Sequence, residues 1–188
     1  LKNTTICCAP SEANINLVLE MHHPMNRTRN TSVVATAIMN TEPEASISEK
    51  SNKISSIDIE YACCSDKGVR VENQDAVMVG AWTGAADSPI VTLAVADGMG
   101  GYEGGKIAAK EALQGFMTTL FSCFPLGNDE PSSEAWIAFI LDAYRQANLT
   151  VNSHAKNYPQ LGTTLVTLLS YKGMFHIANI GDSRAYLI

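Results

Sequence analysis

From Ile57 onward, apolar and polar residues follow two different periods along the chain. Short runs with a period of two, or with continuous apolar character, are typical of β-strands. Five strands are predicted in this way, at residues 57–63, 75–82, 89–97, 163–171 and 174–181. The third of these runs is apolar almost throughout, as expected for a central strand covered on both faces. A tight turn at Lys172–Gly173 is predicted to join the last two strands.

Between the third and the fourth predicted strand, apolar residues recur three and four positions apart, which indicates helices. One helix is predicted from about Glu103 to Cys123. A second begins after a capping Ser132 or Ser133 and ends before the segment 157–162. The resulting order is three strands, two helices and two strands. Strands grouped in runs around a helix pair indicate an α+β fold rather than a parallel sheet of alternating strands and helices.

Residues 1–56 differ in composition from the rest of the chain. They are rich in Ser, Thr, Asn and Glu, and the segment 41–56 contains almost no core-forming residues. This composition predicts an N-terminal tail or linker that is largely disordered, followed by a folded domain at 57–188. Two short apolar runs, at 14–23 and 31–39, are compatible with strands or with the remnants of an upstream element.

The net charge limits the partners that we expect, and the spacing of the cysteines indicates the cell compartment. The formal net charge is −6, which argues against binding to nucleic acid or to an anionic membrane, since both need clustered Lys and Arg. No apolar stretch is long enough to span a bilayer, and we find no secretory signal. The five cysteines include two adjacent pairs, which is not the spacing of a disulfide framework or a zinc site. We therefore expect a cytoplasmic protein with free thiols.

Three acids stand where predicted strands begin or end. Asp75 starts one strand, Asp97 ends the central one, and Asp182 follows another, each next to a turn-forming residue. If these strands are neighbours, the carboxylates share a small volume, where like charges repel and raise one another's pKa. A divalent cation such as Mg²⁺, Mn²⁺ or Ca²⁺ relieves this repulsion. The alternative is that each acid is an ordinary turn or cap residue.

The glycines after Asp97 and the arginine before Asp75 extend this interpretation. Glycine lets the backbone turn so that a carbonyl, such as that of Gly98, also faces a cation. A Gly-rich phosphate loop fits poorly, because neither of its usual spacings is present. Arg70 has the guanidinium geometry of a phosphate clamp. The alternative for Arg70 is a surface ion pair with Glu72, and the sequence alone favours that alternative.

Four segments carry a resemblance to a known family. They are SDKGVRVENQDA at 65–76, LAVADGMGGYEGGKIAA at 93–109, LGTTLVTLL at 161–169 and IANIGDSRAYLI at 177–188. In this order they resemble the successive motifs of the metal-dependent PPM protein phosphatases of the PP2C type, the bacterial branch in particular. The resemblance covers 57–188 and corresponds to the N-terminal part of that domain. It implies an α+β fold in which a β-sandwich of two antiparallel sheets is flanked by antiparallel helix pairs, a four-layer αββα arrangement.

The resemblance also implies a role for each site residue. Asp97 bridges two Mn²⁺ or Mg²⁺ ions, and Gly98 contributes its carbonyl. Asp75 binds on the outer side of the metal pair through water, and Asp182 belongs to a third, weaker metal site. Arg70 holds the substrate phosphate, so that catalysis depends on Asp97 and Arg70. The residues implied to be structural are Gly162, Thr163 and Arg184.

The implied activity is hydrolysis of phosphoserine and phosphothreonine by a metal-activated water, with phosphorylated proteins as substrates and a Ser/Thr kinase as the opposing enzyme. Gln74 and Met99 stand where eukaryotic members carry a second acid and a His, and bacterial members share both features. The later half of the family domain carries two more metal-binding aspartates, and this sequence stops before them. We therefore expect a fragment that is inactive alone.

Two alternatives stay open. A non-catalytic module of the same family would bind a phosphoprotein or a regulatory partner. The presence of Arg70, Asp75, Asp97 and Asp182 argues against it, because such a module does not need all four residues. An unrelated metal-binding α+β protein would require the order of the four motifs to be a coincidence.

Overall fold

The structure is a computed structural model of the chain. It describes residues 5–10, 15–20, 34–40, 58–66, 70–83, 89–99, 103–124, 131–171 and 174–187. The turn expected at Lys172–Gly173 lies outside these described residues.

The described residues form strands around one pair of helices. The first part of the chain contains β1 (Thr5–Pro10), β2 (Ile15–Glu20), β3 (Val34–Asn40) and β4 (Asp58–Cys64). The middle contains β5 (Asp75–Thr83), β6 (Pro89–Met99), α1 (Glu103–Cys123) and α2 (Ser133–Asn152). The last part contains β7 (Gly162–Thr163), β8 (Leu165–Tyr171), β9 (Met174–Ile180) and β10 (Arg184–Leu187). Both predicted helices and all five predicted strands are confirmed, with ends that shift by one or two residues.

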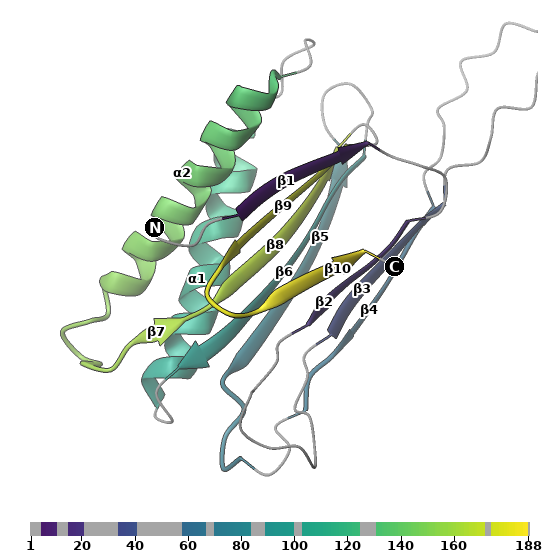
Figure 1. The fold of residues 1–188 in the computed structure, drawn as a ribbon. Helices are drawn as coiled ribbons and strands as arrows, with labels where there is room; N and C mark the ends of the chain where they lie inside the picture. Colours follow the sequence, from purple (N-terminus) through teal and green to yellow (C-terminus); the bar gives the residue numbers. More distant parts are fainter. Residues whose placement is uncertain are drawn as a thin grey trace, which may run out of the picture.

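The strands are arranged in two sheets (Figure 1). The larger sheet has the order β1-β9-β8-β6-β5, and the short β7 pairs with the end of β6. The smaller sheet has the order β10-β2-β3-β4. All pairs within the described residues are antiparallel, which confirms the α+β class.

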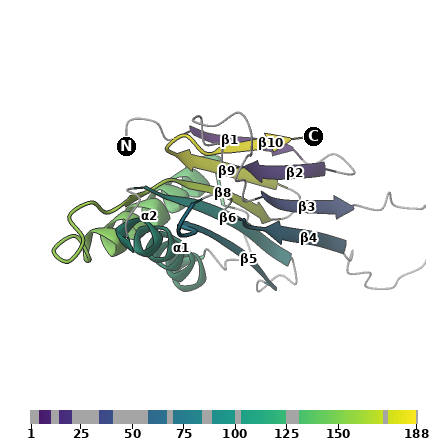
Figure 2. The same ribbon diagram turned by 90° about the horizontal axis from the view of Figure 1, so that it is seen from below.

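The two helices cover one face of the larger sheet (Figures 1 and 2). Helix α2 begins at a serine cap, in which Ser132 Oγ accepts a hydrogen bond of 3.3 Å from the backbone N–H of Ala135. Its buried residues recur three and four positions apart, which places them on one stripe toward the sheet. Among the residues whose burial is described, the largest fully buried side chain is that of Phe116 in α1, which packs edge-on against Tyr144 of α2. The main core therefore lies between the helices and the larger sheet.

The other face of the larger sheet carries a second core. Its buried members are Leu93, Val95, Val166, Leu168 and Phe175. Ala185 of β10, in the smaller sheet, packs against this cluster. Figure 2 shows the smaller sheet on the side of the larger one that faces away from the helices. The described residues thus form three layers of the predicted four-layer sandwich: one helix pair and two sheets.

Three strands lie within residues 1–56, the range predicted to be a largely disordered tail or linker. Two of them, β2 and β3, overlap the apolar runs at 14–23 and 31–39 that are compatible with strands. Strand β1 pairs with β9 at the edge of the larger sheet, and β2 and β3 pair between β10 and β4 in the smaller one. The domain boundary near residue 56 stays a prediction.

Two further sequence predictions concern the membrane and the thiols. In the part of the chain that the structure describes, neither helix is long and apolar enough to cross a membrane. Cys63, Cys64 and Cys123 are exposed free thiols, as predicted.

Candidate metal and phosphate site

The register of β5 and β6 places two of the predicted site acids side by side. Asp75, the first residue of β5, lies directly opposite Asp97 of β6. Side chains alternate along a strand, so Asp97 lies on the same face of β6 as Leu93 and Val95. The side chains of Leu93 and Val95 belong to the core between the two sheets. Asp97 therefore ends the apolar inter-sheet face with a carboxylate, which is only 5% exposed.

Four of the predicted site residues act on one another electrostatically. Burial raises the pKa of the Asp97 carboxyl above its ordinary value. A side-chain hydrogen bond with Asp75 and the positive charge of Arg70 lower this pKa, whereas the negative charge of Asp182 raises it further. Segments far apart in the sequence thus bring Arg70, Asp75 and Asp182 within electrostatic reach of Asp97.

The backbone of Asp97 is fixed by residues from the segment before β8. Its carbonyl oxygen accepts hydrogen bonds from the backbone N–H of Thr164 at 2.9 Å and from Thr163 Oγ1 at 3.0 Å. Its N–H donates to Thr164 Oγ1 at 3.0 Å. The Thr164 hydroxyl also shares a hydrogen bond of 2.6 Å with Ser183, the residue after Asp182. Thr164 therefore connects the two acidic positions.

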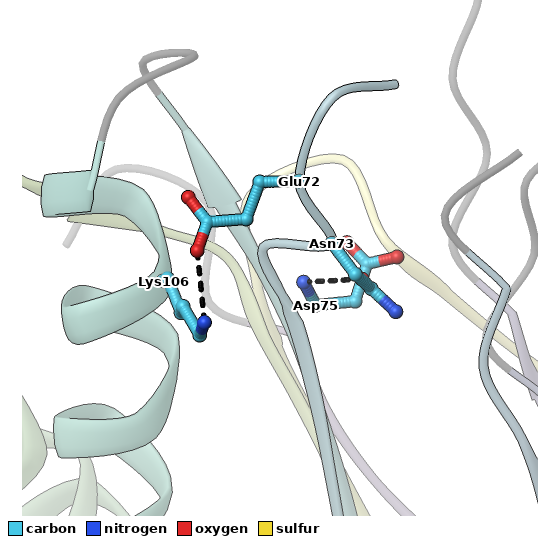
Figure 3. A network of polar contacts seen from close by, with 4 residues as sticks. All are labelled: Glu72, Asn73, Asp75 and Lys106. Carbon is cyan, nitrogen blue, oxygen red and sulfur yellow. Dashed lines mark hydrogen bonds and ion pairs between the residues drawn. The ribbon is translucent and has the colours of Figure 1, made fainter. Parts of the chain in front are cut away.

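The segment 70–74, which carries Arg70, is held by contacts to three other parts of the fold. Glu72 Oε1 accepts a hydrogen bond of 2.8 Å from Lys106 Nζ in the first turns of α1 (Figure 3). Asn73 Oδ1 accepts from the backbone N–H of Asp75 at 3.0 Å, and Asn73 Nδ2 donates to Ser65 Oγ at 2.6 Å. Glu72 raises the pKa of Lys106, first through the hydrogen bond and second through its negative charge. Burial has little influence on this pKa.

Glycine is required where this segment meets the turn after β6. Gly98 donates its N–H to the carbonyl of Gln74 at 3.2 Å. A Cβ atom at Gly98 would lie 2.2 Å from the carbonyl oxygen of Gly105 and 2.7 Å from that of Gln74. These obstacles are backbone atoms, which cannot rotate away. The prediction that glycine permits an unusual approach at this point is consistent with the structure, and the carbonyl ligand role of Gly98 stays a prediction.

The side chains fit a hard divalent cation only in part. Two adjacent carboxylates with oxygen donors, one of them buried, match the ligands that Mg²⁺ and Mn²⁺ prefer. Among the described residues, however, no three His, Cys, Asp or Glu side chains gather closely enough to hold a metal ion. Asp182 acts on Asp97 through its charge and is exposed. The two close carboxylates are therefore part of a donor set for a cation, which the described residues do not complete.

Sequence reasoning found the acids and missed the residues that orient them. Thr163 was interpreted as structural, and its hydroxyl does support Asp97. The roles of Thr164, Ser183 and Lys106 were not predicted. Their contacts to the site join residues 19 to 67 positions apart, a separation at which no local pattern gives a signal.

The sequence of this chain matches a known protein family. Residues 68–188, more than half of the chain, match the family described as Protein phosphatase 2C. This chain belongs to the protein phosphatase 2C family. The resemblance stated from the sequence motifs is thereby confirmed.

Bacterial members of the family are among its relatives. The Ser/Thr protein phosphatase PstP of Mycobacterium tuberculosis is 33% identical over 134 residues, which cover 69% of this chain and 23% of PstP. A putative protein phosphatase of Mycoplasma pneumoniae is 34% identical over 68% of this chain and 50% of its own. The Ser/Thr phosphatase Stp of Listeria monocytogenes is 30% identical over 65% of this chain and 47% of its own. The chain thus spans half or less of the length of these curated relatives.

The fold agrees with a solved structure of the same family. The crystal structure of the M. tuberculosis phosphatase PstP matches with a TM-score of 0.51 and 28% sequence identity. The match covers 69% of this chain and 53% of the PstP chain. The predicted PP2C-type α+β fold is thereby confirmed.

Proposed function

We propose that the complete protein carrying this chain is a metal-dependent protein Ser/Thr phosphatase. The observation that carries the proposal is the pairing of Asp75 with Asp97 at the end of two neighbouring strands, with Arg70 and Asp182 within electrostatic reach. Membership of the protein phosphatase 2C family supports the class of reaction. Phosphorylated proteins are the proposed substrates, because the named relatives are Ser/Thr phosphatases.

The acids of this chain would supply part of a site for Mn²⁺ or Mg²⁺. The carboxylates of Asp97, Asp75 and Asp182 and the carbonyl of Gly98 are the groups of this chain that would hold these ions. When bound, such cations act as Lewis acids that activate water for attack on phosphorus. The chain spans only part of its relatives, so we propose that further ligands come from the rest of the protein and that this fragment alone is inactive.

The protein side chains position the phosphate and limit the solvent. Arg70 binds two phosphoryl oxygens with the parallel N–H donors of its guanidinium and neutralises charge that develops on them. The hydrogen bonds from Thr163 and Thr164 hold the Asp97 backbone, so its carboxylate needs little reorganisation during the reaction. The apolar inter-sheet core directly behind Asp97 keeps that side of the site dry.

Other functional predictions follow from composition and from the family. A Ser/Thr kinase as the opposing enzyme, a cytoplasmic location and the lack of nucleic-acid or membrane partners stay predictions. The alternative of a non-catalytic module that binds a phosphoprotein is retained as an outcome of the test below.

The test is p-nitrophenyl phosphate hydrolysis with added Mn²⁺. It is run on the full-length protein and on the 188-residue chain, each beside its Asp97→Ala variant. We expect activity in the full-length protein, its loss in the variant, and no activity in the 188-residue chain. A full-length protein that binds Mn²⁺ but hydrolyses nothing would favour the non-catalytic module.

A further inference from the structure

Glu72 forms an ion pair with a lysine and is close in sequence to an arginine. In the sequence it is two residues from Arg70, and in space its Oε1 atom is 2.8 Å from Lys106 Nζ (Figure 3). Both side chains of the Glu72–Lys106 pair are partly exposed, at 41% and 58%. The sequence favoured an ion pair between Glu72 and Arg70, but among the described residues the ion pair of Glu72 is the one with Lys106.

The cation with which Glu72 pairs matters for phosphate binding at Arg70. Carboxylates and phosphates compete for the same pair of parallel guanidinium donors. A Glu72 carboxylate that turned toward Arg70 would therefore act as an internal competitor of the substrate phosphate. The charge of Arg70 instead acts on the buried carboxyl of Asp97, whose pKa it lowers. The charge of Arg70 thus reaches the acidic site, while its acidic neighbour in the sequence, Glu72, is paired with Lys106.

We propose that Lys106 is a positioning residue that holds the Glu72 carboxylate away from Arg70, so that the guanidinium stays available for a substrate phosphate. The inference rests on the proposed function, because it assigns Arg70 to the phosphate. An exposed ion pair contributes little to folding, so the effect is on phosphate affinity and not on the stability of the fold.

Two simpler explanations of the same ion pair make different predictions. If the pair only fixed the segment 70–74 in place, removing either partner would weaken phosphate binding equally. If Lys106 only attracted phosphate by its charge, its removal would weaken binding by the same factor with or without Glu72. If the Glu72 carboxylate competes with phosphate for Arg70, removal of Lys106 weakens phosphate binding only while that carboxylate is present. A double-mutant cycle separates the three explanations.

The experiment uses the full-length protein and four variants: Lys106→Gln, Glu72→Gln, the double variant, and Lys110→Gln. Lys110 is exposed one helical turn further along α1, so its variant removes the same charge as a control. Inorganic phosphate is titrated by calorimetry in the presence of Mn²⁺. The KM and kcat for p-nitrophenyl phosphate are measured in parallel, and thermal unfolding confirms that each variant is folded.

We expect Lys106→Gln to weaken phosphate binding about two- to five-fold, the range that an exposed ion pair can account for. KM should rise by the same factor at constant kcat. Glu72→Gln, the double variant and Lys110→Gln should bind at least as tightly as the wild type. Equal weakening by both single variants, the same loss in the double variant, or no loss in Lys106→Gln would overturn the inference. A wild type that neither binds phosphate nor hydrolyses the ester would overturn the proposed function as well.

Discussion

The two ends of strand β6 differ in what holds them. From Ile90 to Ala96 every side chain is buried, at 0–1% exposure, and the segment lies between a helix layer and a second sheet. From Asp97 to Met99 the strand carries an acid and a glycine, and its position depends on hydrogen bonds to residues before β5 and after α2. The structure of the apolar end follows from the local run of apolar residues. The structure of the polar end depends on contacts between residues far apart in the sequence, which form only when the chain has folded.

This difference separates stability from function along one strand. Changes around the apolar part should cost stability first and activity only as a consequence. Changes around Asp97 should affect cation or phosphate binding while most of the fold survives.

Phe116→Ala tests the apolar side of the comparison. Phe116 is 1% exposed and packs edge-on against Tyr144 at a ring centroid distance of 5.6 Å. Its removal leaves a cavity, so we expect the free energy of unfolding to fall by about 3–5 kcal/mol in urea titrations. Phe121 of the same helix is 57% exposed, and Phe121→Ala should cost less than about 1.5 kcal/mol. Equal costs for the two variants would contradict the assignment of the core.

Gly98→Ala tests the close backbone approach at the polar end. The added Cβ would meet the Gly105 carbonyl oxygen at 2.2 Å, so the turn after β6 must shift. We expect a loss of about 2–3 kcal/mol in unfolding free energy together with loss of activity. Gly80→Ala is the matched control, because its nearest obstacle is the flexible end of Met117, at 2.9 Å. If the two variants lost equal stability, the backbone contact at Gly98 would not be the cause.

Thr164→Val removes the hydroxyl that connects Asp97 with Ser183 while it keeps the shape of the side chain. The Asp97 N–H and the buried Ser183 hydroxyl each lose a hydrogen-bond partner. We expect unfolding free energy to fall by about 1–2 kcal/mol and kcat to fall as the Asp97 backbone loosens. Thr164→Ser keeps the hydroxyl and should restore most of both. Failure of the serine variant to do so would indicate that packing of the methyl group, and not the hydrogen bond, is what matters.

His176 gives the smallest effect, visible only through its pH dependence. Burial lowers the pKa of this side chain, which is 2% exposed and stacks on Trp136. Because the unfolded state then binds more protons, its contribution to stability is complete above about pH 6.5 and is lost as the pH falls through the lowered pKa. His176→Phe should therefore flatten the stability curve between about pH 5 and 7 without changing activity. Parallel curves for the two proteins would exclude His176 as the source.

The sequence predicted the regular elements well because their signals are local. The spacing of Phe116, Leu120 and other apolar residues indicates α1 directly, and the continuous run before Asp97 indicates the central strand. Strand β1 was missed because a short edge strand at Thr5–Pro10 has too few residues for a clear period. Its partner in β9 lies more than 160 residues away, so no local pattern announces the pairing.

The charged residues of the candidate site could be predicted from the sequence, but the residues that hold them in position could not. Asp75 and Asp97 stand at strand ends in the sequence, so they lie side by side once β5 and β6 pair, and the charge of Asp182 reaches Asp97 from the end of β9. The residues alone favoured an ion pair of Glu72 with Arg70, its neighbour in sequence, whereas the structure pairs Glu72 with Lys106. Helix α1 returns Lys106 to the same place only after the chain has passed through β5 and β6. Contacts of this kind require the three-dimensional arrangement.

The central claim, that the polar end of β6 binds a divalent cation, is tested most directly by thermal unfolding of the full-length protein with and without Mn²⁺. A ligand that binds the folded state raises the Tm. Burial raises the pKa of Asp97, so without metal its charge disfavours the folded state at neutral pH. We therefore predict that Mn²⁺ raises the wild-type Tm, whereas Asp97→Asn has a metal-free Tm at least as high and shows no rise. An equal rise in both proteins would contradict the account.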